Sequence, residues 1–95
     1  NKEIAAQFKL LSNLMELHGE SPFKIRTYQS AVRTIEKYAR ELKDMTTQQI
    51  MEIPGIGAAV GSKTEQLLAT GHMKVLDEGK EKTPPGIIDL LQVKG

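Results

Sequence analysis

Apolar side chains recur every three or four positions along most of this chain, and no stretch of four or more residues alternates convincingly between apolar and polar. A spacing of three or four places apolar side chains on one face of an α-helix, whereas strict alternation places them on one face of a strand. Glycine and proline interrupt the pattern at short intervals. The sequence therefore predicts an all-α fold of short helices, with no long linker.

The pattern divides into about five to six helices. At 95 residues, a chain buries roughly 60–65% of its extended surface, which leaves room for one core. We therefore expect a single compact helical domain over residues 1–95. The predicted helices cover residues 4–19, about 27–43, a short stretch capped by Thr46 or Thr47 and ending at Pro54, about 58–69, 72–81, and a last turn or two after Thr83.

The expected core consists of the apolar positions on the inner side of each predicted helix. Gly19 and Gly71 follow the first and fourth helices as C-terminal caps. The inner positions are Ile4, Phe8, Leu11 and Met15, then Ala31, Ile35, Tyr38 and Leu42, then Val60, Thr64, Leu67 and Leu68, then Met73 and Leu76, and finally Ile87, Leu90 and Leu91.

Composition excludes several kinds of site. With no cysteine and only His18 and His72, which lie far apart in the sequence, a side-chain metal centre is not expected. No apolar stretch approaches the roughly 20 residues of a membrane span, and Asn1 opens directly into a helical pattern, so neither a membrane partner nor a signal peptide is expected. The absence of cysteine suits a reducing compartment, and we expect a cytoplasmic protein.

Positive charge is concentrated in one segment. Residues 24–43 hold six cationic and two acidic side chains, a net +4, so the remaining residues sum to −3 against the total of +1. On the predicted second helix, Arg33, Lys37 and Arg40 share a sector about 60° wide opposite the apolar face. Such a face could line the phosphates of a nucleic acid, or it could simply keep a surface helix solvated.

A glycine-containing turn, Ile53-Pro54-Gly55-Ile56-Gly57, lies between the short third helix and the longer fourth one. Two glycines one residue apart permit positive φ angles and remove side chains that would hold a ligand away. They leave successive backbone N–H groups at the start of the fourth helix, where a phosphate can bind without a cation. The turn with its two helices, about 47–70, resembles a helix-hairpin-helix. Val93-Lys94-Gly95 echoes the turn, so a second, truncated hairpin is expected to start at 92–95.

These residues resemble the amino-terminal domain of the X-family DNA polymerases, which are related to DNA polymerase beta. The resemblance rests on Ile53–Gly57 followed by a helix ending Leu67–Gly71, on Pro22–Tyr28 with Ala31 upstream, and on Pro84–Gly95 downstream, which resembles the family's run-in to a second hairpin. It covers essentially the whole chain. By family analogy, polymerase domains would be covalently linked to this segment in the full-length protein, where they would carry the polymerase carboxylates that the segment lacks.

The resemblance implies a DNA repair role, in which the domain grips phosphates of gapped or nicked duplex without sequence specificity. It implies that Lys24 and Tyr28 contact the 5′-phosphate and order a lyase pocket. We expect a monomer that works in the bacterial cytoplasm on nucleoid DNA. The expected DNA-binding residues are Gly55, Ile56, Gly57, Ala58, Lys24, Arg26, Tyr28, Arg33, Lys37 and Arg40.

Lys63 matches the family's Schiff-base lysine, which attacks a 5′-deoxyribose phosphate before β-elimination. Helical spacing places Lys63 about 40° from Leu67 and about 60° from Val60, at the rim of the apolar face. There it is either a partly desolvated nucleophile or an ordinary lysine reaching to water. The alternative to pure DNA binding is therefore a lyase that uses Lys63, and a protein-interaction hairpin is a further alternative.

Four positions depart from the family pattern. Ala59 and Val75 stand where relatives carry phosphate-binding lysines, Phe23 replaces a histidine, and Ser62 replaces an acidic residue beside the nucleophile. Lys74 could replace the cation missing at Val75, although helical spacing puts it on a different side of its helix. The family resemblance also implies a monovalent cation, K⁺ or Na⁺, held by main-chain oxygens of Met51, Ile53 and Ile56; no other cofactor is expected.

Overall fold

Six α-helices and one 3₁₀ turn, η1, account for most of residues 1–92, the part of the chain that the computed structural model describes. No strand occurs in this part, so the predicted all-α class is confirmed. No helix in it is both long and apolar enough to cross a membrane. The expected second hairpin at 92–95 falls, apart from Gln92, outside the described residues. The elements are α1 (Lys2–Leu17), α2 (Pro22–Lys37), η1 (Leu42–Asp44), α3 (Thr47–Met51), α4 (Gly57–Thr70), α5 (Lys74–Glu81) and α6 (Pro85–Gln92).

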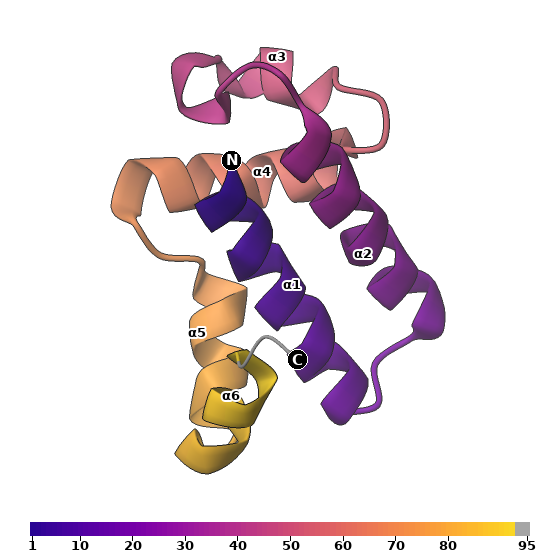
Figure 1. Ribbon diagram of the computed structural model, residues 1–95, viewed down its shortest axis with the longest axis vertical. Helices are drawn as coiled ribbons and strands as arrows, with labels where there is room; N and C mark the ends of the chain where they lie inside the picture. Colours follow the sequence, from indigo (N-terminus) through magenta and orange to yellow (C-terminus); the bar gives the residue numbers. More distant parts are fainter. Residues whose placement is uncertain (93–95) are drawn as a thin grey trace.

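The helices α1 and α2 pack side by side as an antiparallel pair (Figure 1). The helix α4 crosses one end of this pair, near the start of α1, and α3 packs on α4. The helices α5 and α6 lie beside α1 at the other end. The hairpin and the α4–α5 junction are therefore held on a common α1–α2 platform.

One apolar core lies between these helices. Phe8 on α1 and Tyr28 on α2 stack at its centre, with ring centroids 6.0 Å apart and planes 15° from parallel. Ile50 and Ile53 bring the hairpin into the same cluster, and Leu76 brings in α5. Because the hairpin shares the main core, its position is fixed relative to α2.

Two predicted helix ends are confirmed. Gly19 follows α1 with a φ of 73°, and the N–H of Glu20 donates to the carbonyl of Met15 at 2.9 Å. Gly71 follows α4 with a φ of 77°, and its N–H donates to the carbonyl of Leu67 at 2.8 Å. Both are left-handed glycine caps of the kind that satisfies the last free carbonyls of a helix.

The predicted range of the second helix, 27–43, is wrong at both ends. The helix begins at Pro22, where proline's missing N–H costs nothing. It ends at Lys37 because Tyr38 is extended, with ψ at 127°. The Asn1 side chain binds the chain beyond this point: its amide nitrogen donates to the carbonyls of Tyr38 and Arg40 at 3.2 and 2.8 Å, and its oxygen accepts from the N–H of Leu42 at 2.9 Å.

Some predicted inner positions are also wrong. Leu68 is exposed because Val60, Thr64 and Leu67 already occupy the inner side of α4. On α6, Ile88 and Leu91 pack against the core, whereas Ile87 is exposed and Leu90 is 70% exposed. The inner side of α6 therefore includes Ile88 and Leu91, and of the three predicted positions only Leu91 packs inward.

Candidate nucleic-acid interface

The hairpin begins with a well-capped α3. The Thr46 hydroxyl accepts from the N–H of Gln49 at 3.2 Å, and the Gln49 side chain accepts from the N–H of Thr46 at 2.9 Å. This reciprocal pair is a capping box, which satisfies two backbone donors that a helix start otherwise leaves free. Of the two threonines that the sequence allowed as caps, Thr46 is therefore the one used.

The turn itself is anchored by its isoleucines and opened by its glycines. The side chains of Ile53 and Ile56 are buried in the core, whereas Gly55 and Gly57 are exposed. The φ angles of the two glycines are 94° and 69°, values that other residues rarely adopt. Burying the isoleucines turns the backbone of the exposed glycines outward.

The first turn of α4 is accessible. Gly57 and Ala58 are exposed, and Ile56 at the N-cap position provides no side-chain cap. The first N–H groups of an α-helix have no partner within the helix, and the helix dipole adds partial positive charge there. Three of the predicted DNA-binding residues, Gly55, Gly57 and Ala58, are therefore exposed at one accessible turn, whereas the fourth, Ile56, is buried and its N–H donates to the carbonyl of Ile53.

Of the three predicted cation ligands, Ile53 and Ile56 lie on the turn, and Met51 is the last residue of α3 just before it. The carbonyl of Ile53 accepts the N–H of Ile56 at 3.0 Å, and the carbonyl of Ile50 accepts the N–H of Ile53 at 3.1 Å. A carbonyl oxygen has two lone pairs, so the Ile53 oxygen keeps capacity for a second partner.

The predicted basic face of the second helix is corrected by the structure. Lys37 ends α2, and Arg40 lies in the irregular chain after it, so Arg40 does not share a helix face with Arg33 and Lys37. Arg26, Arg33 and Lys37 are exposed on α2. The early end of the helix therefore reduces the predicted Arg33–Lys37–Arg40 face to its first two members.

Lys24 and Tyr28 lie on a different side of α2, one helical turn apart. Lys24 is exposed, whereas Tyr28 is only 9% exposed and stacks on Phe8. The Tyr28 ring is therefore part of the core and cannot intercalate between bases. Phe23, beside Lys24 in the first turn, is by contrast 80% exposed.

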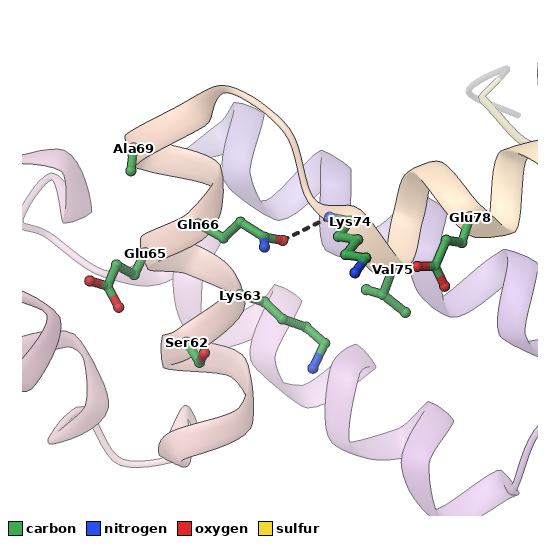
Figure 2. A pocket seen from close by; sticks show the side chains of 8 residues that line it. All are labelled: Ser62, Lys63, Glu65, Gln66, Ala69, Lys74, Val75 and Glu78. Carbon is green, nitrogen blue, oxygen red and sulfur yellow. Dashed lines mark hydrogen bonds between the residues drawn. The ribbon is translucent and has the colours of Figure 1, made fainter.

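Lys63 lines a pocket of about 640 Å³ between α4 and α5 (Figure 2). Its side chain is half-buried, and its ammonium lies 5.6 Å from the centroid of the Tyr28 ring. This contact ties the predicted nucleophile to the predicted pocket residue Tyr28. The other lining residues are Ser62, Glu65, Gln66, Ala69, Lys74, Val75 and Glu78.

Lys74 lines the same pocket as Val75, although helical spacing predicts that the two side chains lie on different sides of α5. Figure 2 shows the Lys74 side chain beside Val75, on the α5 wall that faces Lys63. The Gln66 side chain accepts the N–H of Lys74 at 2.7 Å, which fixes the first turn of α5 against α4. The pocket therefore holds two lysines, one from each helix, despite the valine at position 75.

The sequence did not indicate Gln66, Glu78 or Thr34. Glu78 brings a carboxylate to the pocket opposite Lys63, and Gln66 joins its two walls. Thr34 lies against the hairpin, because a Cβ at Gly55 would sit 3.0 Å from its hydroxyl oxygen. All three are ordinary polar residues, and a single sequence carries no signal for their positions beside the pocket or the hairpin turn.

Comparison with known proteins agrees with this geometry. A family model described as "Helix-hairpin-helix domain" matches residues 1–73. The chain is 28% identical over 94 residues to the DNA polymerase/3′-5′ exonuclease PolX of Bacillus subtilis (strain 168). The match covers 99% of this chain and 16% of that relative, so the chain spans only a small part of the relative's length. The predicted resemblance to X-family polymerases is thereby confirmed.

Proposed function

The chain belongs to the helix-hairpin-helix domain family, and we propose on this basis that it binds the phosphate backbone of DNA without reading its sequence. Backbone amides at the hairpin turn would receive one phosphate, and cationic side chains of α2 would contact others. Contacts to phosphates position a protein on DNA but carry no base information. The proposed ligand is gapped or nicked duplex, as in a DNA repair intermediate.

The accessible, uncapped start of α4 is the observation that carries this proposal. Its first amides lie beside two positive-φ glycines and bear no side chain beyond a methyl group. A DNA phosphate could therefore approach the backbone directly and gain hydrogen bonds and the favourable end of the helix dipole. The similarity to a DNA polymerase/exonuclease supports DNA as the source of that phosphate.

A glycine pair supplies the decisive test. Gly57→Ala places a methyl group at the hairpin turn and strains a φ of 69°, whereas Gly71→Ala strains a φ of 77° at the opposite end of α4. Neither added Cβ meets another atom within 4 Å. Both variants should lose similar stability, about 1 kcal/mol. Only Gly57→Ala should weaken binding to gapped duplex, by about tenfold, since it disturbs one charge-assisted hydrogen-bond site.

Binding should also weaken steeply with salt, because phosphate neutralisation releases condensed counterions. Fluorescence anisotropy over a salt series measures both effects. Equal affinities for the two glycine variants would remove the hairpin from the DNA footprint. Salt-independent or undetectable binding would instead favour a hairpin that packs on a partner protein.

A second candidate function, 5′-deoxyribose-phosphate lyase activity, is supported by the position of Lys63. The amine of Lys63 would add to the C1′ aldehyde of the ring-opened sugar and lose water to form a Schiff base. Loss of the C2′ proton and cleavage of the C3′–O bond would release the downstream strand with its 5′-phosphate. Water would then hydrolyse the imine and free Lys63.

Features of the pocket favour this chemistry. The Tyr28 ring restrains the Lys63 side chain, Lys74 offers a second cation for the sugar phosphate, and Glu78 offers a carboxylate that could accept the C2′ proton. Borohydride reduction should trap a covalent complex with DNA carrying a 5′-deoxyribose phosphate in a one-nucleotide gap. Loss of the complex in Lys63→Ala but not in Lys74→Ala would identify the nucleophile. No trapped species alongside intact, salt-sensitive binding would leave the domain a DNA-binding module only.

The remaining parts of the proposal concern the hairpin cation and the whole protein. A K⁺ or Na⁺ ion on the main-chain oxygens of Met51, Ile53 and Ile56 would let the turn hold a phosphate from a second side. Replacing K⁺ by a bulky organic cation at constant ionic strength should then weaken binding. We also propose that the chain acts as a monomer on nucleoid DNA in the cytoplasm, linked to polymerase domains in the full-length protein.

A further inference from the structure

The outer surface of α2 carries a row of exposed side chains that the hairpin and the pocket do not use. Arg26, Ser30, Arg33 and Lys37 follow one another at intervals of four, three and four residues. This spacing places them on one ridge of a helix, which we call the outer ridge. One Arg33 guanidinium nitrogen donates to the Ser30 hydroxyl at 3.4 Å, and α2 forms an outer edge of the molecule in Figure 1.

The outer ridge and the Lys63 pocket lie on different sides of α2. Lys24 and Tyr28, on the side nearest Lys63, are about 140–180° around the helix from Arg26, Arg33 and Lys37. With side chains, an α-helix is about 10–12 Å across. One phosphate therefore cannot contact both the ridge and the pocket, and the ridge needs a separate segment of ligand.

The hairpin turn lies between these two sides. A Cβ at Gly55 would sit 3.0 Å from the Thr34 hydroxyl, which places the turn against the C-terminal half of α2. Thr34 is about 60° around α2 from Lys37, on the side away from Glu36. From the hairpin, the outer ridge thus starts at Lys37 and leads back along α2 to Arg26 at its far end.

We propose that the outer ridge binds the double-stranded arm of the DNA whose strand is held at the hairpin, so that this arm runs along α2. The proposal rests on the DNA binding proposed above and specifies where the double-stranded arm goes. The strand's 5′ end would reach the pocket on one side of α2, and the duplex behind it would run along the ridge on the other. The ridge suits this ligand because its four members include three cations and no acid.

The length of the ridge makes the proposal quantitative. The axial distance from Lys37 to Arg26 is about 16 Å, which matches about five base pairs of a duplex lying along the helix. Lys37 should therefore contact short arms as well as long ones. Arg26 should contact only arms that extend several base pairs past the hairpin.

The test measures affinity against the length of the 5′-phosphorylated arm of a gapped duplex, with the opposite arm held constant. The ridge variant carries Arg26→Gln, Arg33→Gln and Lys37→Gln. Its matched control carries Lys2→Gln, Lys43→Gln and Lys82→Gln, which removes the same charge from three exposed lysines elsewhere. All of these side chains are exposed, and circular dichroism checks that both variants remain helical.

For the wild type and the control, affinity should rise with arm length over about five base pairs and then level off. The ridge variant should lose this rise, and its log–log salt slope on long arms should fall by about 2.7, or about 0.9 for each lost contact. Arg26→Gln alone should weaken binding to DNA with long arms only, whereas Lys37→Gln alone should weaken binding at every arm length.

Three outcomes would contradict the binding of the duplex arm to the outer ridge. They are equal losses in ridge and control variants, losses that follow the length of the opposite arm, and losses that do not depend on either arm. The first outcome would mean that the ridge affects binding only through the net charge of the protein. The second would mean that the ridge contacts the opposite duplex arm. If the wild type failed to bind gapped duplex at all, the proposed function itself would fail, which the wild-type titration detects separately.

Discussion

The ammonium of Lys63 lies 5.6 Å from the centroid of the Tyr28 ring, and that ring is stacked on Phe8 in the core. The relationship joins three helices: α4 provides the cation, α2 the ring, and α1 the support behind it. Cation–π contacts of this kind contribute about 0.5–1 kcal/mol at exposed sites and more when desolvated. The candidate nucleophile is therefore held by the core rather than free at the surface.

Tyr28→Leu should destabilise the domain by about 2–4 kcal/mol, since it removes both the aromatic stack and the surface beneath Lys63. Tyr28→Phe keeps the ring and should cost less than about 1 kcal/mol. Urea denaturation followed by circular dichroism measures both changes. Equal losses for the two variants would show that the hydroxyl, and not the ring, stabilises this position.

Lys74→Gln should weaken binding to gapped DNA that ends in a 5′-phosphate and lower its salt slope by about 0.9. The reason is that Lys74 lines the pocket with Lys63. Lys80→Gln is the matched control, because Lys80 lies on the same helix, about 120° around it from Lys74. Titration against 5′-phosphate and 5′-hydroxyl DNA gives the comparison. If Lys74→Gln weakened binding to 5′-phosphate and 5′-hydroxyl DNA equally, the pocket would be excluded as the binding site of the terminal phosphate.

Gly61→Ala should destabilise the domain although alanine is the better helix former by about 1 kcal/mol. A Cβ at this buried glycine would collide with the Cγ of Met51, so the Met51 side chain would have to leave its present conformation or α3 would have to shift on α4. We expect a net loss of about 1–2 kcal/mol from overpacking. Gly86→Ala, where no atom lies within 4 Å of the added Cβ, should be neutral or stabilising. Thermal unfolding that ranked the two variants in the reverse order would contradict this packing.

Thr46→Ala should cost about 1 kcal/mol and loosen α3, because it removes the cap that accepts from the N–H of Gln49. Thr47→Ala should have little effect, since Thr47 is the first helical residue and makes no cap. Hydrogen exchange at Ile50 and Met51 should accelerate in the first variant only. Faster exchange in the second variant would instead assign the cap to Thr47.

Most of the helices and the hairpin could be predicted from the sequence because their signals are local. The period of the apolar residues located α1, α4 and α5 to within a few residues, and Gly19 and Gly71 marked two helix ends. The predicted end of the second helix was wrong because the helical periodicity continues past Lys37, the true end, to Tyr38 and Leu42. Leu42 is buried as predicted, but from η1 and not from α2.

The sequence predicted the backbone part of the candidate site, which is the glycine turn, but only some of the side chains that line the pocket. The turn at Ile53–Gly57 could be recognised because glycines at positive φ are a property of the chain itself. The convergence of Lys63, Lys74 and Glu78 depends on the angle between α4 and α5. That angle depends on contacts between separate helices, including the hydrogen bond from the Lys74 N–H to the Gln66 side chain and the packing of α5 on α1, which the periodicity of a single helix does not reveal.

The sequence by itself thus determined the helical class, the hairpin and the segment of positive charge, since these depend on spacing, glycine conformation and composition within short windows. Only the tertiary structure decided where α2 ends, through the Asn1 side chain bound to Arg40 and Leu42 about 40 positions later. It also decided which cations share a surface, separating the outer ridge from the pocket. The physical reason is that backbone hydrogen bonds within a helix are local, whereas the contacts that end a helix or set the angle between two helices join residues far apart in the chain.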